Sequence, residues 1–204
     1  MICGSTYSPR DECWQYRPPS NSWVKLSTMP EYGGSVGYAY SDAWGLVLSG
    51  AGSADKSVLF TRDGVNFSYL APLPTSVNDG CLVILDDSTL MAIGLGNSED
   101  EVYVYHGGEE ENAWEAFPSL SVGRGGMACG TAMQGDDLIV VAAGGGRFED
   151  DPPRSDVVEV FNLQEMQWHT GESKSSNEAK SLIKSSCFSH PTAGNIIRGQ
   201  DHPI

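Results

Sequence analysis

An internal repeat limits what this chain can fold into more than any other feature of its sequence. Four segments share one layout, in which a first aromatic residue is followed by a polar turn and a second aromatic residue. The first aromatic residues are Tyr16, Phe60, Tyr105 and Phe161, and the second are Trp23, Phe67, Trp114 and Trp168. The two are separated by 7, 7, 9 and 7 positions. A register kept four times predicts one structural unit repeated along the chain.

A second pattern fills the intervals between these segments. Residues 37–52, 80–96 and 126–146 each read as a strand, a short polar turn, an apolar strand and a final glycine. The turns carry the serine, aspartate and glycine residues that tight hairpins favour. The apolar strands are hydrophobic on both faces, as strands buried between packed sheets are. Each unit is therefore predicted to be four short antiparallel strands, which is the composition of a propeller blade.

The predicted fold class is all-β, with about three to four four-stranded antiparallel blades arranged in an incomplete ring. The 24 glycines and 11 prolines agree with a chain of many turns. Blade units are predicted at residues 1–30, 31–74, 75–121 and 122–171, followed by an irregular or disordered tail at 172–204.

These residues resemble the kelch repeat. That pattern is an apolar strand ending in two glycines, a Tyr-Asp pair near the end of the third strand, and a tryptophan about seven residues later. Gly144 and Gly145 keep the glycine pair, whereas the other blades have a single glycine at Gly50 and Gly94. The residue after the first aromatic also departs from the pattern in all four units. The resemblance covers about residues 1–171 and implies a kelch-type β-propeller.

The first unit begins partway through a blade. Residues 2–4 match the end of a second strand, and nothing before them matches a first strand. Propellers close with about four to eight blades, and four partial units fall short of a ring of kelch geometry. We therefore expect the chain to be part of a larger propeller.

The charge of the chain ranks its partners. With 12 basic and 27 acidic residues, the formal net charge is −15. Such a surface repels phosphate backbones and anionic lipids, so neither a nucleic-acid nor a membrane partner is predicted. The sequence has no apolar run of membrane-spanning length and no secretory signal in residues 1–12. It leaves the compartment open, with the cytoplasm slightly favoured and an extracellular site retained for a chain truncated at its N-terminus.

The cysteines give no indication of a metal site. None of the five lies in a CxxC pair or at a ligand-like spacing from a histidine, so no metal and no cofactor are predicted. Cys3 and Cys13 are close enough in sequence to pair in an oxidising compartment. Cys81 and Cys129 lie in apolar runs, where cysteine often serves as a small core residue.

No catalytic residue is predicted. His106, His169, His190 and His202 lack a neighbouring serine or cysteine in a nucleophile-like context. Three acidic runs, at residues 99–101, 109–111 and 149–151, fall in predicted turns and loops, where solvated charge is expected. Residues 61–67 resemble the Asp-box of sialidases but lack one residue of its spacing, so a hairpin turn is predicted there.

The loop at residues 147–156 is the most informative candidate for binding. It lengthens the gap between glycine and first aromatic to 17 residues, against 10 and 11 in the neighbouring units. Long loops on rigid scaffolds often carry binding sites, and a phenylalanine between charged residues is typical of an interface anchor. A tolerated insertion explains the length equally well. The candidate partner-binding residues are Arg147, Phe148 and Arg154.

The predicted function is a non-catalytic protein–protein interaction module that presents its inter-strand loops to a protein partner of unknown identity. The alternative is a fragment of a propeller enzyme, because kelch-like propellers include a copper-dependent sugar oxidase and sialic-acid-type isomerases. Those activities require a Tyr/Cys/His copper constellation or convergent acids and arginines at the axis. Four histidines, none in a predicted innermost strand, make the binding module the preferred prediction.

Overall fold

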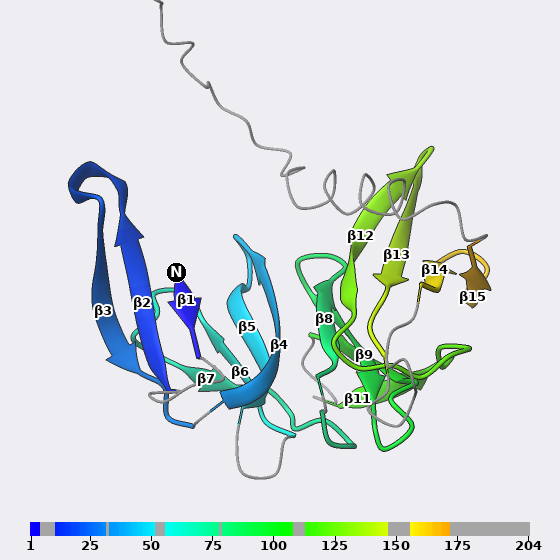
Figure 1. The fold of residues 1–204 in the computed structure, drawn as a ribbon, viewed down its shortest axis with the longest axis horizontal. Helices are drawn as coiled ribbons and strands as arrows, with labels where there is room; N and C mark the ends of the chain where they lie inside the picture. Colours follow the sequence, from blue (N-terminus) through cyan, green and yellow to red (C-terminus); the bar gives the residue numbers. More distant parts are fainter. Residues whose placement is uncertain are drawn as a thin grey trace, which may run out of the picture.

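The fold is described from a computed structural model of the 204-residue chain. The structure describes residues 1–4, 11–31, 33–51, 56–77, 79–107, 113–146 and 156–171. Its strands follow one another from β1–β3 at one end of the molecule to β14 and β15 at the other (Figure 1). Among these residues there is no α-helix.

Four antiparallel sheets make up the described chain. Sheet I contains β1 (Ile2–Cys3), β2 (Glu12–Arg17) and β3 (Ser22–Thr28), with a 3-10 turn, η1 (Pro18–Ser20), between the last two. Sheet II contains β4 (Gly33–Ser41), β5 (Gly45–Ala51), β6 (Val58–Thr61) and β7 (Ser68–Tyr69). Sheet III contains β8 (Cys81–Ile84), β9 (Thr89–Leu95), β10 (Glu101–His106) and β11 (Trp114–Phe117). Sheet IV contains β12 (Ala128–Gln134), β13 (Asp137–Ala143), β14 (Val158–Asn162) and β15 (Gln167–Thr170).

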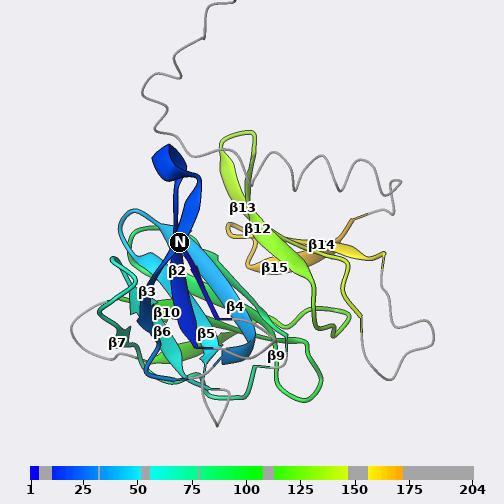
Figure 2. The same cartoon turned by 60° about the vertical axis from the view of Figure 1, so that its left-hand side comes forward.

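Each sheet is a meander in which strands adjacent in sequence are adjacent in space. This order confirms the predicted all-β fold of propeller-like blades, and the sheets do not close into a ring. Sheet I has three strands, and β1 corresponds to the second strand of the other sheets because it pairs with β2. The β2–β3 and β12–β13 hairpins rise from the same side of the molecule at its opposite ends (Figure 1, Figure 2).

A glycine with left-handed backbone lies within one residue of the end of the second strand in each four-stranded sheet. Gly50, Gly94 and Gly144 have φ values of 81°, 77° and 69°, which side chains other than glycine rarely adopt. Gly145 follows with φ 82°, and a Cβ on it would lie 2.6 Å from the carbonyl oxygen of Gly125. The repeated glycine therefore marks a backbone turn that leaves the sheet between its second and third strands.

Apolar side chains fill the space between consecutive sheets in three clusters. Cys13 and Leu59 belong to the cluster between sheets I and II, and Val47 and Leu90 to the one between sheets II and III. The cluster between sheets III and IV includes Phe161. Each sheet thus has a leading face, toward the preceding sheet, and a trailing face, toward the next, as alternation of side chains along a strand requires.

The described chain contains two disulfide bonds, one within a sheet and one between two sheets. Cys3–Cys13 joins the directly paired strands β1 and β2 within sheet I. Cys81–Cys129 joins β8 to β12, the first strands of sheets III and IV, across a sequence separation of 48 residues. The latter two cysteines were expected as small core residues. They do pack against the core between sheets III and IV, but as a covalent link between the two sheets.

Sheet II departs from the repeat in how its third and fourth strands, β6 and β7, are paired. Phe60 and Phe67 do not lie opposite each other as the aromatic residues of the other three sheets do, because Phe60 lies opposite Ser68 and packs toward sheet III. Phe67 instead packs toward sheet I. The carboxylate of Asp63 organises this hairpin, accepting hydrogen bonds from the backbone N–H groups of Val65 and Asn66 at 2.8 Å each. The segment is therefore a turn, as predicted.

Candidate interaction surface

Two aromatic pairs, one in sheet III and one in sheet IV, form the contact between each of these sheets and the sheet before it. Tyr105 lies directly opposite Trp114, and Phe161 directly opposite Trp168. Their ring centroids are 5.4 and 5.1 Å apart, in tilted arrangements that aromatic pairs favour. All four side chains are buried on the leading face of their sheet, with exposed fractions of 9% or less.

Each of these tryptophans is also tied to the preceding sheet by a hydrogen bond. The indole Nε1 of Trp114 donates to the carbonyl oxygen of Ala71 at 2.9 Å, and that of Trp168 donates to Pro118 at 2.7 Å. Ala71 follows β7 and Pro118 follows β11, so the acceptor comes from the same place in both preceding sheets. The apolar contact and the single polar contact together fix one sheet against the next.

Sheet I carries the same aromatic pair with nothing described in front of it. Tyr16 lies directly opposite Trp23, and their ring centroids are 5.4 Å apart. Cys13 packs toward sheet II, so Tyr16, three positions later in β2, lies on the leading face together with Trp23 opposite it. The exposed fractions are 41% for Tyr16 and 49% for Trp23. The pair thus has the geometry of an interface without being covered by any described residue.

Charged groups border this aromatic pair. Glu12 accepts hydrogen bonds from the Nζ of Lys25 and the Nε1 of Trp14. The hydrogen bond from Lys25 is the main cause that lowers the pKa of the Glu12 carboxyl below its ordinary value. The phenolic oxygen of Tyr16 donates to Asn21 at 2.8 Å. These bonds hold the side chains around the Tyr16–Trp23 pair in place on the open face, as an interface anchor requires.

Two further tyrosines are exposed next to sheet I. Tyr38 and Tyr40 lie opposite Leu48 and Leu46 in β4 and β5, on the leading face of sheet II. Because β1 corresponds to a second strand, sheet I has no first strand among the described residues, and β4, the first strand of sheet II, faces no such strand in this part of the chain. A hydrogen bond to Asp42 is the largest of the causes that raise the pKa of Tyr40.

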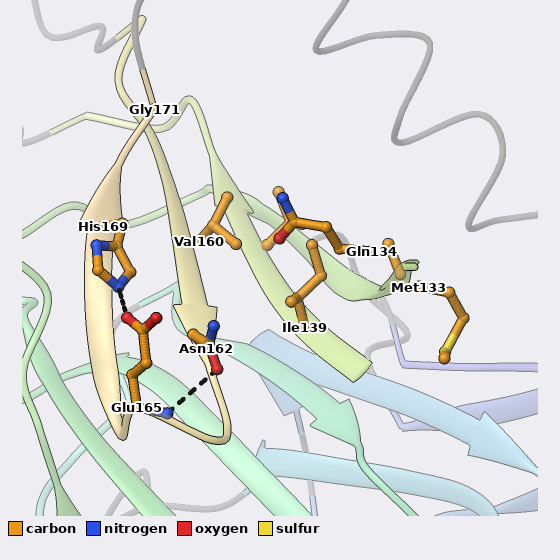
Figure 3. Close-up of a pocket in the computed structure, with 10 residues that line it drawn as sticks. Met133, Gln134, Ile139, Val160, Asn162, Glu165, His169 and Gly171 are labelled. Carbon is orange, nitrogen blue, oxygen red and sulfur yellow. Dashed lines mark hydrogen bonds and ion pairs between the residues drawn. The ribbon is translucent and has the colours of Figure 1, made fainter. Parts of the chain in front are cut away.

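The opposite end of the molecule carries an open hollow on the trailing face of sheet IV. It has a volume of about 520 Å³, and every described residue that lines it belongs to sheet IV or its connections. Figure 3 shows the side chains of Val160, Ile139 and Gln134 around it. His169 and Glu165 are hydrogen-bonded at its rim, with His169 Nε2 2.6 Å from the carboxylate. The walls are otherwise mostly apolar.

A buried ion pair between sheets III and IV was not predicted from the sequence. Arg124 precedes β12 and Glu159 lies in β14; both side chains are fully buried, with Nη1 and Oε2 2.7 Å apart. Glu159 also accepts a hydrogen bond from the backbone N–H of Ser121 at 2.7 Å. The available signal was the position of each charge inside an apolar or glycine-rich run, GRGGM and VEVF. The pair joins the loop that enters sheet IV to its third strand, which is a structural role.

The three predicted partner-binding residues, Arg147, Phe148 and Arg154, lie outside the residues that the structure describes. The described ends of their loop are Gly146, which forms an isolated bridge with Gly125, and Asp156, just before β14. The acidic runs at 109–111 and 149–151 and the tail at 172–204 are outside the described part as well.

The other candidate groups are not brought together. His106 ends β10, and His169 lies in β15 of another sheet. Within the described ranges, no group of three or more histidine, cysteine or acidic side chains has the geometry to hold a metal ion. The same part of the chain contains no helix of the length and apolarity needed to cross a membrane.

Comparisons with known proteins identify the fold. No family model and no curated protein matches the chain, whereas 130 chains of solved structures do. One of them, described as "Structure of YjhT", aligns with a TM-score of 0.61 at 16% identity over 82% of this chain. The present chain spans 65% of that protein. At this identity the likeness shows the fold alone, and the class it defines is an all-β protein built of propeller-like blades.

Proposed function

We propose that this chain is a segment of a kelch-type β-propeller and acts as a non-catalytic protein–protein interaction module. The kelch assignment is supported by the aromatic pairs and by the positive-φ glycine near the end of each second strand. The fold by itself does not assign a function, because one fold hosts many functions and the surface residues decide which one a protein has.

One observation carries the proposal: the exposed Tyr16–Trp23 pair of sheet I. Large aromatic side chains are enriched among the residues that dominate protein–protein binding energies. In sheets III and IV the equivalent pairs are buried against another sheet and make an indole hydrogen bond to it. The Tyr16–Trp23 pair has the geometry of the buried pairs, but nearly half of its surface is exposed. Such a surface is suited to bind a protein.

The loop at 147–156 is a second part of the same proposal. It starts beyond the bridge of Gly146 with Gly125 and ends before β14, so it leaves a scaffold held by sheet and bridge hydrogen bonds. Arg147, Phe148 and Arg154 are proposed to contact a protein partner together with the open faces of the sheets. The formal charge of −15 favours a partner surface that is basic or neutral around the aromatic contact.

Site-specific photo-crosslinking tests this function. A benzoylphenylalanine side chain replaces Tyr16, 41% exposed, in one variant and, as a control, the more exposed Tyr69 of sheet II, 54% exposed, in another. We expect a discrete crosslinked polypeptide from the Tyr16 position, identified by mass spectrometry, and none from the Tyr69 position. Equal or absent crosslinking at the two positions would refute the proposal that the aromatic face is a binding surface.

A further inference from the structure

We propose that Asn66 is an N-linked glycosylation site and that this chain is made in an oxidising compartment where asparagine is glycosylated. Residues 66–68 read Asn-Phe-Ser, the acceptor pattern in which serine or threonine follows an asparagine two positions later and the middle residue is not proline. No other asparagine of the 204 residues has this spacing. The inference goes beyond the proposed function, because it concerns a covalent modification of sheet II and not a protein partner.

The structure places this motif where a glycan has room. Asn66 lies at the end of the turn between β6 and β7, and both Asn66 and Ser68 are exposed. Phe67 between them packs toward sheet I, so the acceptor amide and the serine stay accessible while the middle residue anchors the hairpin. β7 is the outer strand of sheet II, and no described strand pairs with its other edge. The motif therefore has the surface position that glycosylation of asparagine requires.

The amide of Asn66 can carry a sugar without losing the contact that orders its turn. Its Nδ2 atom has two hydrogens and donates one of them to Oδ2 of Asp63 at 2.7 Å. Glycosylation replaces one hydrogen and leaves the other for this bond. The backbone N–H groups of Val65 and Asn66 donate to Oδ1 of the same carboxylate and are not altered. The folded hairpin is therefore compatible with the modified residue.

The reaction transfers a sugar to nitrogen, and its co-substrate is an oligosaccharide activated by a lipid pyrophosphate. The Nδ2 atom of Asn66 forms a bond to C1 of the first sugar while the bond between C1 and the pyrophosphate oxygen breaks. The lipid pyrophosphate leaves with that electron pair, and one Nδ2 proton passes to a base. Nothing is oxidised or reduced in this step. This chain supplies the acceptor, and a separate transferase supplies the catalysis.

The two disulfide bonds are an independent indication of the same compartment. Cys3–Cys13 joins neighbouring strands, and Cys81–Cys129 joins two sheets. Structural disulfides form and persist in oxidising environments, such as the endoplasmic reticulum and the cell exterior, and are rare in the cytosol. The asparagine acceptor motif belongs to proteins of the same route. Of the two compartments that the sequence left open, the disulfides and the motif favour the extracellular one.

Peptide mass spectrometry of the protein isolated from its own source tests the site. Free thiols are blocked before denaturation, and half of the sample is treated with peptide-N-glycosidase. We expect a glycan on the peptide that contains Asn66, conversion of Asn66 to aspartate by the glycosidase, and no blocked thiol at Cys81 or Cys129. The peptide with Asn21 is the internal control, because this exposed asparagine has Trp23 two positions later and should stay unmodified.

Three variants of the full chain, directed into the secretory pathway of a eukaryotic cell, assign the modification to the motif. The wild type should have a mass above the 21.9 kDa of the polypeptide, and glycosidase should return it to that value. Asn66→Gln and Ser68→Ala should both have the polypeptide mass without treatment, whereas Ser68→Thr keeps the acceptor pattern and should be glycosylated. Because Ser68 is exposed, its two substitutions leave the sheet interior unchanged, and thermal unfolding checks that each variant is folded.

Four results would overturn the inference. They are a secreted wild type of unmodified mass, a glycan that persists in Ser68→Ala, an unmodified Asn66 in the protein from its own source, and free thiols at Cys81 and Cys129 in that protein. The last would place the chain in a reducing compartment. None of them affects crosslinking at position 16, so the proposed function is tested separately.

Discussion

The interface between sheets III and IV and the leading face of sheet I present the same aromatic pair in two states. Phe161 and Trp168 are buried, while Tyr16 and Trp23 are close to half exposed. The buried pair is accompanied by an interblade disulfide and a fully buried ion pair, and neither accompanies the exposed one. The repeat therefore specifies the geometry of the pair within a sheet. How much the pair contributes to the free energy of unfolding depends on whether a neighbouring sheet covers it.

The largest effect is expected from comparing the two tryptophans directly. Trp168→Ala should lower the free energy of unfolding by about 5 kcal/mol, near the top of the range for buried large-to-small changes, because an indole hydrogen bond is lost too. Trp23→Ala should cost about 1 kcal/mol or less, since an exposed pair loses little burial. Urea unfolding of both variants under conditions that keep the chain monomeric measures the difference. Equal losses would mean that Trp23 is covered in solution.

Removing one partner of the buried ion pair should have the next largest effect. Arg124→Met leaves the Glu159 carboxyl group buried between sheets III and IV without its cation, which should cost about 4 kcal/mol. The double variant Arg124→Met/Glu159→Gln should recover part of that loss because no buried charge remains. Chemical denaturation of the two variants and wild type measures the recovery. A double variant as unstable as the single one would show that packing, rather than the unpaired charge, sets the cost.

The positions of these elements were predictable from the sequence to different degrees. Strand order and hairpin positions follow from local patterns, since alternation, turn residues and glycine act within a few residues. The Arg124–Glu159 pair and the Cys81–Cys129 bond join residues 35 and 48 positions apart, counted as 159 − 124 and 129 − 81. Such contacts depend on how two sheets pack. A single sequence shows charge or cysteine in an apolar run without showing its partner.

Phe60 shows a different limit of pattern reading. It holds the position of the first aromatic residue in the repeat, yet it lies opposite Ser68 and faces sheet III, whereas Tyr105 and Phe161 face the preceding sheet. A shift of one residue moves a strand's side chain to the opposite face, so an aromatic residue beside the right position still fits a sequence pattern. The exposed state of Tyr16 and Trp23 was equally unreadable, because exposure depends on what lies in front of the sheet.

The two disulfide bonds allow the stability gained from a covalent link between two sheets to be compared with that gained from a link within one sheet. By chain entropy, loss of Cys81–Cys129 should cost about 4 kcal/mol and loss of Cys3–Cys13 about 3 kcal/mol, because the closed loops differ in length. Urea unfolding of Cys81→Ala/Cys129→Ala and Cys3→Ala/Cys13→Ala without reductant, each compared with the wild type, measures both losses. The former should also loosen the Trp168 environment, visible in tryptophan fluorescence, and the latter should not. Identical fluorescence would show that packing alone holds sheets III and IV.

The smallest effect on stability is expected in sheet II, where the third and fourth strands have no cross-strand aromatic pair and the carboxylate of Asp63 holds their hairpin turn. Backbone hydrogen bonds from Asn66 and Val65 hold the pKa of Asp63 well below its ordinary value. A carboxyl whose pKa is lowered by folding stabilises the native state above its unfolded pKa of about 3.9, and that contribution is lost as pH falls through the folded value. Wild type should therefore lose hairpin stability in acid below about pH 4.

Asp63→Ala should remove this acid dependence while lowering stability slightly at neutral pH, because the Val65 and Asn66 N–H groups lose their acceptor. Asp63→Asn keeps an acceptor oxygen but cannot titrate, so it should retain most of the neutral stability and none of the acid loss. Hydrogen exchange of the Val65 and Asn66 amides across this pH range measures the effect locally. Unchanged protection in Asp63→Ala would mean that Phe67, packed toward sheet I, holds the hairpin without the carboxylate. Sheet II would then depend on its neighbour as sheets III and IV do.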